Sequence, residues 1–395
     1  MTLSSKHILV LSSVYPLSPD GHHGAFIREI ILRLQSTGAR FSVFAPAYEG
    51  SRSYELEGVR VHRFRYFFKR FENLVRDGAP TKMQRQPLYI FPAITYVILG
   101  SLQLFWLCLR LRPHLIHVNW CFPHGLMAWP ASVLLRIPMV FSFYGADLLL
   151  ARRFGFVSPL LKGLIPYAKE VTAISSFTSG LVHKLCDRPI HLIPYGVTVE
   201  AKPPKPRPAE SRPRVLFVGR LDERKGVRYL LNAMALMLKE REVQLRIVGA
   251  GILESDLKAQ AQGLGIADRV NFLGFVTKEE LVEEYATCDV FVLPAIVDRK
   301  GDTEGLGIVM MEALAHTKPV VATAVGGIPD VIRPGETGCL VPEKNPVALA
   351  NAIADLLDRP EWAAQLGRQG LMDIQTRFGW PRIVDLWQRV YQRAL

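Results

Sequence analysis

Cysteine is scarce in this sequence, and its spacing fits neither a disulfide framework nor a metal site. The 395 residues include five cysteines, an odd number, with no Cys-x-x-Cys pair and no zinc-type Cys/His pattern. Disulfide-stapled folds need paired cysteines, whereas intracellular proteins keep theirs reduced. We therefore expect neither disulfides nor a structural zinc ion, and we expect a cytoplasmic protein.

The opening residues lack the features of a secretory signal peptide. Their apolar run, HILVLSSV, is short, and the segment reaches Pro16 without a small-residue cleavage site. We interpret this run as the first buried strand of the fold.

Acidic residues are scarce in the first half of the chain. Hydrophobic residues make up 49% and charged residues 21% of the sequence, which excludes a disordered or fibrous chain. The net charge is +12, yet residues 1–210 hold 25 Lys and Arg against only 12 Asp and Glu. We therefore expect the first half to meet an anionic partner: nucleic acid, an anionic membrane surface or a phosphorylated substrate.

Charge is absent altogether from residues 88–109, a run as long as a bilayer is thick. Pro92 and Gly100 interrupt its apolar character. Just before it, residues 60–76 mix phenylalanine with arginine and lysine, a composition typical of segments at an anionic lipid interface. Three interpretations stay open: a helix packed inside the first domain, a helix dipping into the membrane surface, and a membrane span.

Short apolar runs alternate with helical segments along the whole chain, as in RVLFVGR and PVVATAVG. Runs that are continuously apolar indicate strands covered on both faces, and therefore an α/β fold with parallel sheets. Residues 199–214 contain five prolines and read as a linker. We predict two Rossmann-like domains facing a central cleft, 1–200 and 201–377.

The segment FVGRLDERKG places two cations between a strand and a helix. The strand ends at Val218, Gly219 permits a tight turn, and Arg220 and Lys225 follow before the helix. Arginine and lysine beside a helix N-terminus suit phosphate oxygens. A solvated loop with ordinary charges would look the same.

The segment EGLGIVMME carries two glutamates eight residues apart. Glu304 would lie at the cap of a helix and Glu312 two turns into it, with Gly305 and Gly307 between them. The glycines allow close approach of a ligand, and free amides at the helix start can hold a pyrophosphate. A carboxylate at position 312 would suit a ribose diol.

These motifs, with YGADL, TAIS, IPYGV and the closing FGWPRIVDLWQRVYQRAL, together resemble the retaining glycosyltransferases of family 4 (glycosyl transferases group 1). The resemblance extends over nearly the whole chain. It implies the GT-B architecture of two Rossmann-like domains with parallel sheets. It also implies that the helix at 378–395 crosses back to the first, acceptor-binding domain, and that 201–377 binds the nucleotide-sugar donor.

The resemblance assigns a role to each motif residue. Arg220 and Lys225 would neutralise the donor diphosphate, and Glu304 would lie by the transferred sugar. The amides of Gly305, Leu306 and Gly307 would lie near the sugar, and Glu312 would bind the ribose. Gly24 would let the loop of the first domain approach the donor phosphate. Phe275 and Val276 would lie by the base. The family pattern implies no metal ion and no cofactor.

The sequence departs from the family in the first domain. Many members have histidine where this chain has Asn119 and Tyr144, and asparagine where it has Tyr195. Some relatives instead carry a Pro-His pair, which FPHG matches at His124. The resemblance therefore implies that His124 contacts sugar or acceptor, with Asp147 close by.

We predict a retaining glycosyltransferase of the hexosyltransferase type. It would move a sugar from a nucleoside-diphosphate donor to a glycan or lipid-linked acceptor, such as a polysaccharide intermediate. Peripheral contact with an anionic membrane would explain the basic half. Nucleic acid is not expected, because no helix-turn-helix, RNA-recognition or zinc-finger pattern occurs. The alternatives are a UDP-sugar epimerase of GT-B fold and a non-catalytic nucleotide-sugar-binding protein.

Overall fold

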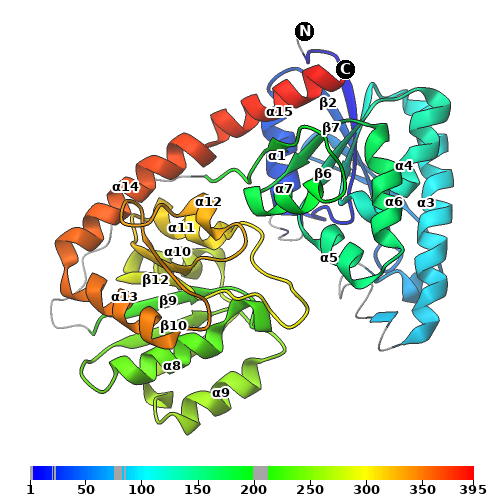
Figure 1. Ribbon diagram of the computed structural model, residues 1–395. Coiled ribbons are helices and arrows are strands. Elements are labelled where there is room, and N and C mark those ends of the chain that lie inside the picture. The colour runs from blue at the N-terminus through cyan, green and yellow to red at the C-terminus, as the bar shows by residue number, and fades with distance from the viewer. Residues whose placement is uncertain (1–2, 20, 22–23, 75–81, 84–85, 199–211) are drawn as a thin grey trace. The chain divides into compact units, whose positions relative to one another are not determined.

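The computed structural model describes residues 3–19, 21, 24–74, 82–83, 86–198 and 212–395 (Figure 1). The chain divides into two compact units. The first unit consists of Met1–Gly196 with Ile383–Leu395, and the second of Val197–Arg382. Residues 199–211 of the expected linker lie outside the described residues.

The first unit is built on a sheet of eight strands in the order β3-β4-β2-β1-β5-β6-β7-β8. Neighbouring strands are parallel except β3 and β4, which pair antiparallel. The strand order reverses between β1 and β5. The strands are β1 (His7–Leu11), β2 (Arg40–Pro46), β3 (Tyr54–Leu56), β4 (Val59–Phe64), β5 (Leu115–Asn119), β6 (Met139–Phe143), β7 (Ala168–Ala173) and β8 (His191–Leu192).

Helices connect these strands and cover the sheet. They are α1 (Ala25–Gln35), α3 (Ile90–Leu111), α4 (Cys121–Leu135), α5 (Ala146–Arg153), α6 (Val157–Leu164) and α7 (Ser176–His183), with short 3-10 turns at η1 (Lys69–Phe71), η2 (Pro87–Tyr89) and η3 (Ile165–Tyr167). The last helix, α15 (Trp380–Ala394), returns to this unit from residue 383 onward. Its Tyr391 hydroxyl lies 2.8 Å from Nδ1 of the buried His117 on β5.

The uncharged run at residues 88–109 forms most of α3. Side chains at four-residue spacing along one face of this helix are buried, namely Pro92, Tyr96, Gly100, Leu104 and Cys108. The Met127 side chain of α4 packs against Gly100, in the space that a Cβ at this position would take. The helix is therefore docked on the first unit along one face, while its length and composition would also allow a span.

The second unit has a six-stranded sheet, and all its strand pairs are parallel in the order β11-β10-β9-β12-β13-β14. The order reverses between β9 and β12. The strands are β9 (Arg214–Val218), β10 (Gln244–Val248), β11 (Val270–Gly274), β12 (Val290–Leu293), β13 (Val320–Thr323) and β14 (Cys339–Val341). The sequence prediction of α/β units with parallel sheets is thus confirmed for both units.

The helices of the second unit are α8 (Val227–Met237), α9 (Glu254–Gly263), α10 (Lys278–Thr287), α11 (Ile308–Ala315), α12 (Ile328–Val331), α13 (Pro346–Asp358) and α14 (Pro360–Phe378), with turns η4 (Glu223–Lys225) and η5 (Ala267–Arg269). Thr277 caps α10 through a complete capping box with Glu280. Such local signals fix where this helix begins.

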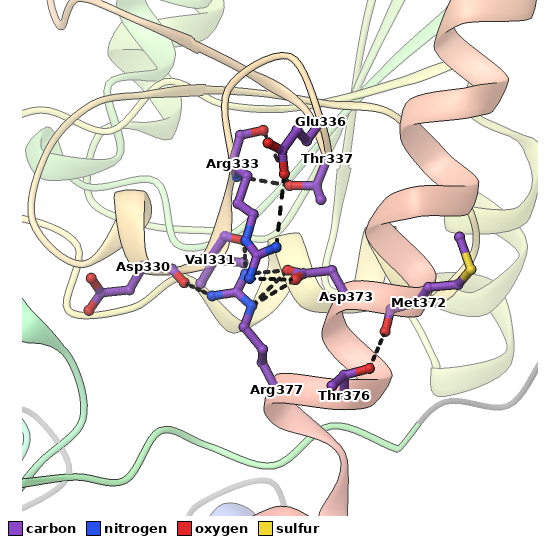
Figure 2. Close-up of polar contacts among 9 residues, drawn as sticks. All are labelled: Asp330, Val331, Arg333, Glu336, Thr337, Met372, Asp373, Thr376 and Arg377. Atoms are coloured by element: carbon purple, nitrogen blue, oxygen red, sulfur yellow. Dashed lines mark hydrogen bonds and ion pairs between the residues drawn. The ribbon is translucent and has the colours of Figure 1, made fainter.

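A group of charged side chains fastens α14 to the end of α12 (Figure 2). The Arg377 guanidinium donates to the carbonyl oxygens of Asp330 (2.6 Å) and Val331 (2.8 Å). It also pairs with the Asp373 carboxylate, which in turn lies 3.2 Å from Nη2 of Arg333. These contacts hold the end of α12 against α14.

Candidate functional site

The predicted donor residues gather where the second sheet reverses its strand order. The loop after β9 carries Arg220 and Lys225, and the loop after β12 carries Glu304. The amide of Ile296 donates to the Arg224 carbonyl oxygen (2.8 Å), which ties the two loops together. In open parallel sheets, ligands bind outside the carboxyl ends of the strands at such a reversal.

Lys225 and Glu304 form a buried ion pair at the centre of this region. The Lys225 Nζ lies 2.5 Å from Oε2 of Glu304, and each side chain is about a tenth exposed. Burial alone would raise the pKa of Glu304, yet the charges of Lys225 and Arg224 outweigh it and hold that pKa below the usual range. The carboxylate is therefore ionised at neutral pH.

Arg224 is a third cation of this site and was not among the residues predicted from the sequence. Its guanidinium donates to the Thr303 carbonyl oxygen (3.2 Å), directly before Glu304. It also lies 3.5 Å from the Asp222 carboxylate, which Arg220 contacts at 2.7 Å. Its place between Arg220 and Lys225 in the motif GRLDERKG was the available signal. The Arg220 side chain is 71% exposed, so it is open to an anion from solvent.

Glycine holds the backbone of Glu304 in position. The Gly327 amide donates to the Glu304 carbonyl oxygen (2.9 Å), and a Cβ at Gly326 would lie only 2.1 Å from that oxygen. Gly326 also has a φ of +57°, which favours glycine. The turn after β13 can therefore lie directly against Glu304. On the other side, Gly307 caps α11, which begins at the next residue, and the Leu306 amide bonds the Glu304 carboxylate.

The remaining predicted donor residues lie on neighbouring elements. Glu312 on α11 accepts from the Tyr285 hydroxyl (2.7 Å), and burial raises its pKa. Gly305 lies between Glu304 and the start of α11. Phe275 and Val276 follow β11, and Phe275 is 86% exposed. A ring so open to solvent is available for stacking.

In the first unit, Gly24 stands directly before α1. Its φ is +80°, and a Cβ there would lie 2.9 Å from the Val14 carbonyl oxygen. The loop after β1 therefore closes tightly on the helix start, at the point where the first sheet reverses its strand order. The preceding residues 22 and 23 lie outside the described residues.

His124 is buried, and both of its ring nitrogens are engaged within the first unit. Nδ1 lies 2.7 Å from the Asn119 carbonyl oxygen, and Nε2 lies 2.9 Å from the Tyr96 hydroxyl. A carbonyl only accepts, so Nδ1 carries the proton and Nε2 accepts from tyrosine. Burial lowers the His124 pKa to about 4. Direct contact with a sugar would require one of these two bonds to break.

Asp147 lies beside the same turn, in the first turn of α5. Its Oδ2 accepts from the Cys121 amide (3.1 Å) and its Oδ1 from the Leu148 amide (3.2 Å). Burial raises its pKa to about 7, and the amides counteract that rise in part. Asp147 and His124 thus both bond to the backbone of the turn after β5.

Four aromatic side chains cluster at this end of the first sheet, and as a group they escaped the sequence analysis. The rings of Phe26, Trp120, Tyr144 and Tyr195 lie between 4.8 and 6.0 Å from one another in five pairs. All four are half-buried. The Tyr144 hydroxyl donates to Oδ1 of Asn119 (2.7 Å), so two residues that depart from the family pattern form one contact.

Comparison with known proteins places both units in one family. The description "Glycosyl transferases group 1" matches residues 198–371, and "Glycosyl transferase 4-like domain" matches residues 23–196. Sucrose-phosphate synthase from Thermosynechococcus elongatus shares the fold, with a TM-score of 0.75, 24% identity and 98% of each chain covered.

Curated relatives match part of the chain. A GDP-mannose-dependent alpha-(1-6)-phosphatidylinositol monomannoside mannosyltransferase of Mycolicibacterium smegmatis is 39% identical, over 40% of this chain and 42% of its own length. A putative colanic acid biosynthesis glycosyltransferase of Escherichia coli is 32% identical, over 57% of each chain. The chain thus spans about half the length of the curated relatives it matches. With both units matched to the same group, the chain belongs to the group 1 (family 4) glycosyltransferases of GT-B fold.

Proposed function

We propose that this protein transfers a sugar from a nucleoside-diphosphate sugar to an acceptor and retains the anomeric configuration. The observation that supports it most is the buried Lys225–Glu304 pair at the strand reversal of the second sheet. A cation and a carboxylate fixed side by side suit the two ends of a sugar diphosphate. The cation would face phosphate oxygens, and the carboxylate would accept from sugar hydroxyls.

The cations near Lys225 would stabilise the leaving diphosphate. Charge accumulates on that group as the bond to the sugar breaks, and fixed donors aimed at it lower the barrier. Arg220 is exposed enough to reach an incoming phosphate, whereas Arg224 is held in place by Thr303. In this proposal Arg220, Arg224 and Lys225 stabilise the diphosphate and no metal ion is invoked. The carboxylates of Asp222, Asp302 and Glu304 balance part of their charge before the donor binds.

The proposed acceptor is a lipid-linked or surface glycan intermediate. The names of two relatives support this class, since one acts on a phosphatidylinositol mannoside and the other belongs to colanic acid biosynthesis. In the first unit, the half-buried cluster of Phe26, Trp120, Tyr144 and Tyr195 offers aromatic faces and tyrosine hydroxyls. Such rings combine an apolar surface with a polar tip, which suits a sugar ring.

The test is a transfer assay with purified protein, a panel of nucleoside-diphosphate sugars and a lipid-linked acceptor extract, with products identified by mass spectrometry. Wild-type protein should form a glycosylated product, and Lys225→Ala combined with Glu304→Ala should lose almost all of it. Removing both members avoids leaving one charge buried and alone. Undiminished transfer by the double variant would refute the site. An altered sugar formed without acceptor would indicate an epimerase, and donor binding without turnover would indicate a binding protein.

A further inference from the structure

The outer face of α3 is apolar and is not covered by any of the described residues. Between residues 87 and 109 every exposed side chain is apolar, with Phe91 58% and Trp106 68% exposed. The exposed set on this helix follows helical spacing and consists of Ile90, Phe91, Ile94, Ile98, Leu99, Leu102, Trp106 and Leu109. At a rise of 1.5 Å per residue this stripe is about 30 Å long, a patch that soluble surfaces seldom leave open.

The opposite face fixes α3 to the rest of the first unit. Tyr96 bonds to His124 on α4, and Gln103 exchanges two hydrogen bonds with the backbone of Arg65. A helix held in this way along its whole length cannot leave the unit to cross a bilayer. It can, however, lie in the plane of a membrane surface with its apolar face immersed.

Exposed apolar side chains also occur on neighbouring helices. Helix α4 packs against α3, and α6 packs against α4 (Figure 1). Large apolar side chains are exposed on both, namely Trp129, Val133 and Leu134 on α4, and Leu160 on α6. Phe156, the residue before α6, is also exposed. Exposed apolar side chains are therefore not confined to one helix.

Basic side chains border this face. A pocket of about 490 Å³ is lined by Arg52, Arg63, Arg65 and Lys69, and the Arg65 backbone bonds to Gln103 of α3. Arg65 is paired with the buried Glu72 carboxylate (2.6 Å), so the other three side chains supply the uncompensated positive charge at this pocket. The exposed Phe68 precedes Lys69 and Arg70 on η1. At the other end of the helix, Arg110 and Arg112 are exposed. Such a border of cations and aromatic rings matches the headgroup layer of an anionic membrane.

We propose that the outer face of α3, bordered by these basic residues, docks the protein on an anionic lipid surface. A second copy of the chain is the competing occupant, but a two-fold contact would bring the like-charged borders of two copies together. Residues 1–210 hold 25 basic against 12 acidic residues, and this excess of positive charge also favours an anionic lipid surface. Anionic headgroups attract this charge, and acyl chains accept the apolar stripe.

Vesicle flotation with the purified full chain tests the proposal without any sugar donor, so its result is independent of the proposed activity. Wild-type protein should float with phosphatidylglycerol-containing vesicles, and it should bind pure phosphatidylcholine vesicles at least about tenfold more weakly. The variant Ile98→Gln/Leu102→Gln/Trp106→Gln should lose at least about tenfold in binding, because three apolar side chains no longer enter the lipid. Arg110→Gln should weaken binding to the phosphatidylglycerol-containing vesicles and leave binding to pure phosphatidylcholine vesicles unchanged.

The matched control is Val347→Gln/Met372→Gln, which replaces two exposed apolar side chains of the second unit. It should bind vesicles as the wild type does, and all variants should keep the wild-type melting temperature. Equal binding by the α3 variant and the control would overturn the proposal. Wild-type protein that does not bind vesicles would also overturn the proposal. If that protein elutes as a dimer and the α3 substitutions make it monomeric, the outer face of α3 is a protein interface instead.

Discussion

At the scale of single residues, the proposed donor site depends on a charge pair that burial makes sensitive to change. Lys225 and Glu304 are each about one-tenth exposed, and each supplies the other's counter-charge. Two buried charges compensate each other's lost hydration only while both are present. The pair is therefore positioned before any donor arrives.

Replacement of the carboxylate alone should abolish most turnover. Glu304→Gln keeps the shape of the side chain but removes the carboxylate that accepts from Lys225 and that is proposed to accept from the sugar, so kcat should fall about 100-fold or more. Glu279→Gln, at an exposed position on α10, is the control and should match the wild type. Steady-state kinetics on the purified variants decide this. A Glu304→Gln enzyme with wild-type kcat would remove Glu304 from the chemistry.

His124 should make the first unit sensitive to acid. Burial lowers its pKa to about 4 from an ordinary 6.5. Between these two pH values the imidazole is protonated in the unfolded chain and neutral in the folded chain. Stability should therefore be lost as the pH falls from about 6.5 toward 4. The variant His124→Gln does not titrate. In denaturant unfolding at pH 7 and pH 5, the wild type should lose on the order of 1 to 2 kcal/mol relative to the variant. A difference that stays constant with pH would contradict the assignment.

At the scale of elements, the strands were predictable and the contacts between loops were not. The run RVLFVGR predicted β9, because a strand covered on both faces must be apolar throughout. The Lys225–Glu304 contact joins residues 79 positions apart, which no local pattern encodes. In the same way, the sequence proposed His124 for chemistry but could not show that Tyr96, on another helix, occupies its Nε2.

The orientation of α3 was also beyond the sequence. Its buried face contains Tyr96, Gly100 and Cys108, while its exposed face contains isoleucine, leucine and tryptophan. When both faces are apolar, helical periodicity does not distinguish inside from outside. The sequence alone therefore left three interpretations of this helix open.

Gly326 should be required for the geometry around Glu304. In Gly326→Ala the new Cβ would lie 2.1 Å from the Glu304 carbonyl oxygen, so that loop must shift and kcat/KM should fall at least about tenfold. Gly335→Ala is a matched control, because φ is +76° there but no atom lies within 4 Å of the added Cβ. It should cost about 1 kcal/mol of stability and little activity. Equal activity of the two variants in the transfer assay would refute the role of Gly326.

Asp373 should stabilise the second unit through its ion pairs with Arg377 and Arg333, which hold α14 against the end of α12. Its side chain is 9% exposed and faces both Arg377 and Arg333 (Figure 2). Asp373→Asn would turn an amide donor toward these guanidinium groups, which should lower the free energy of unfolding by about 2 kcal/mol. Asp355→Asn removes an exposed pair with Arg359 and should cost less than about 0.5 kcal/mol. Denaturant titration compares the two, and equal losses would contradict this role of Asp373.

At the scale of the whole molecule, the positive charge is concentrated in the first half of the chain. The net charge of +12 comes from residues 1–210, and the rest of the chain is close to neutral. The neutral part contains the Lys225 site, where a few placed cations suffice for a diphosphate. The basic part contains the exposed apolar face of α3 and its border of arginine and lysine. A lipid-linked acceptor would connect the two, because it is presented at the surface on which α3 is proposed to dock.

The central claim is that a nucleoside diphosphate binds at Lys225, and calorimetric titration with a panel of nucleoside diphosphates tests it most directly. At least one nucleotide should bind the wild type, and Lys225→Ala should bind it at least about tenfold more weakly, since a buried charge-assisted bond to phosphate is lost. Lys258→Ala, at an exposed position on α9, should bind as the wild type does. Lys225→Ala protein that binds the nucleotide as tightly as the wild type would contradict the account.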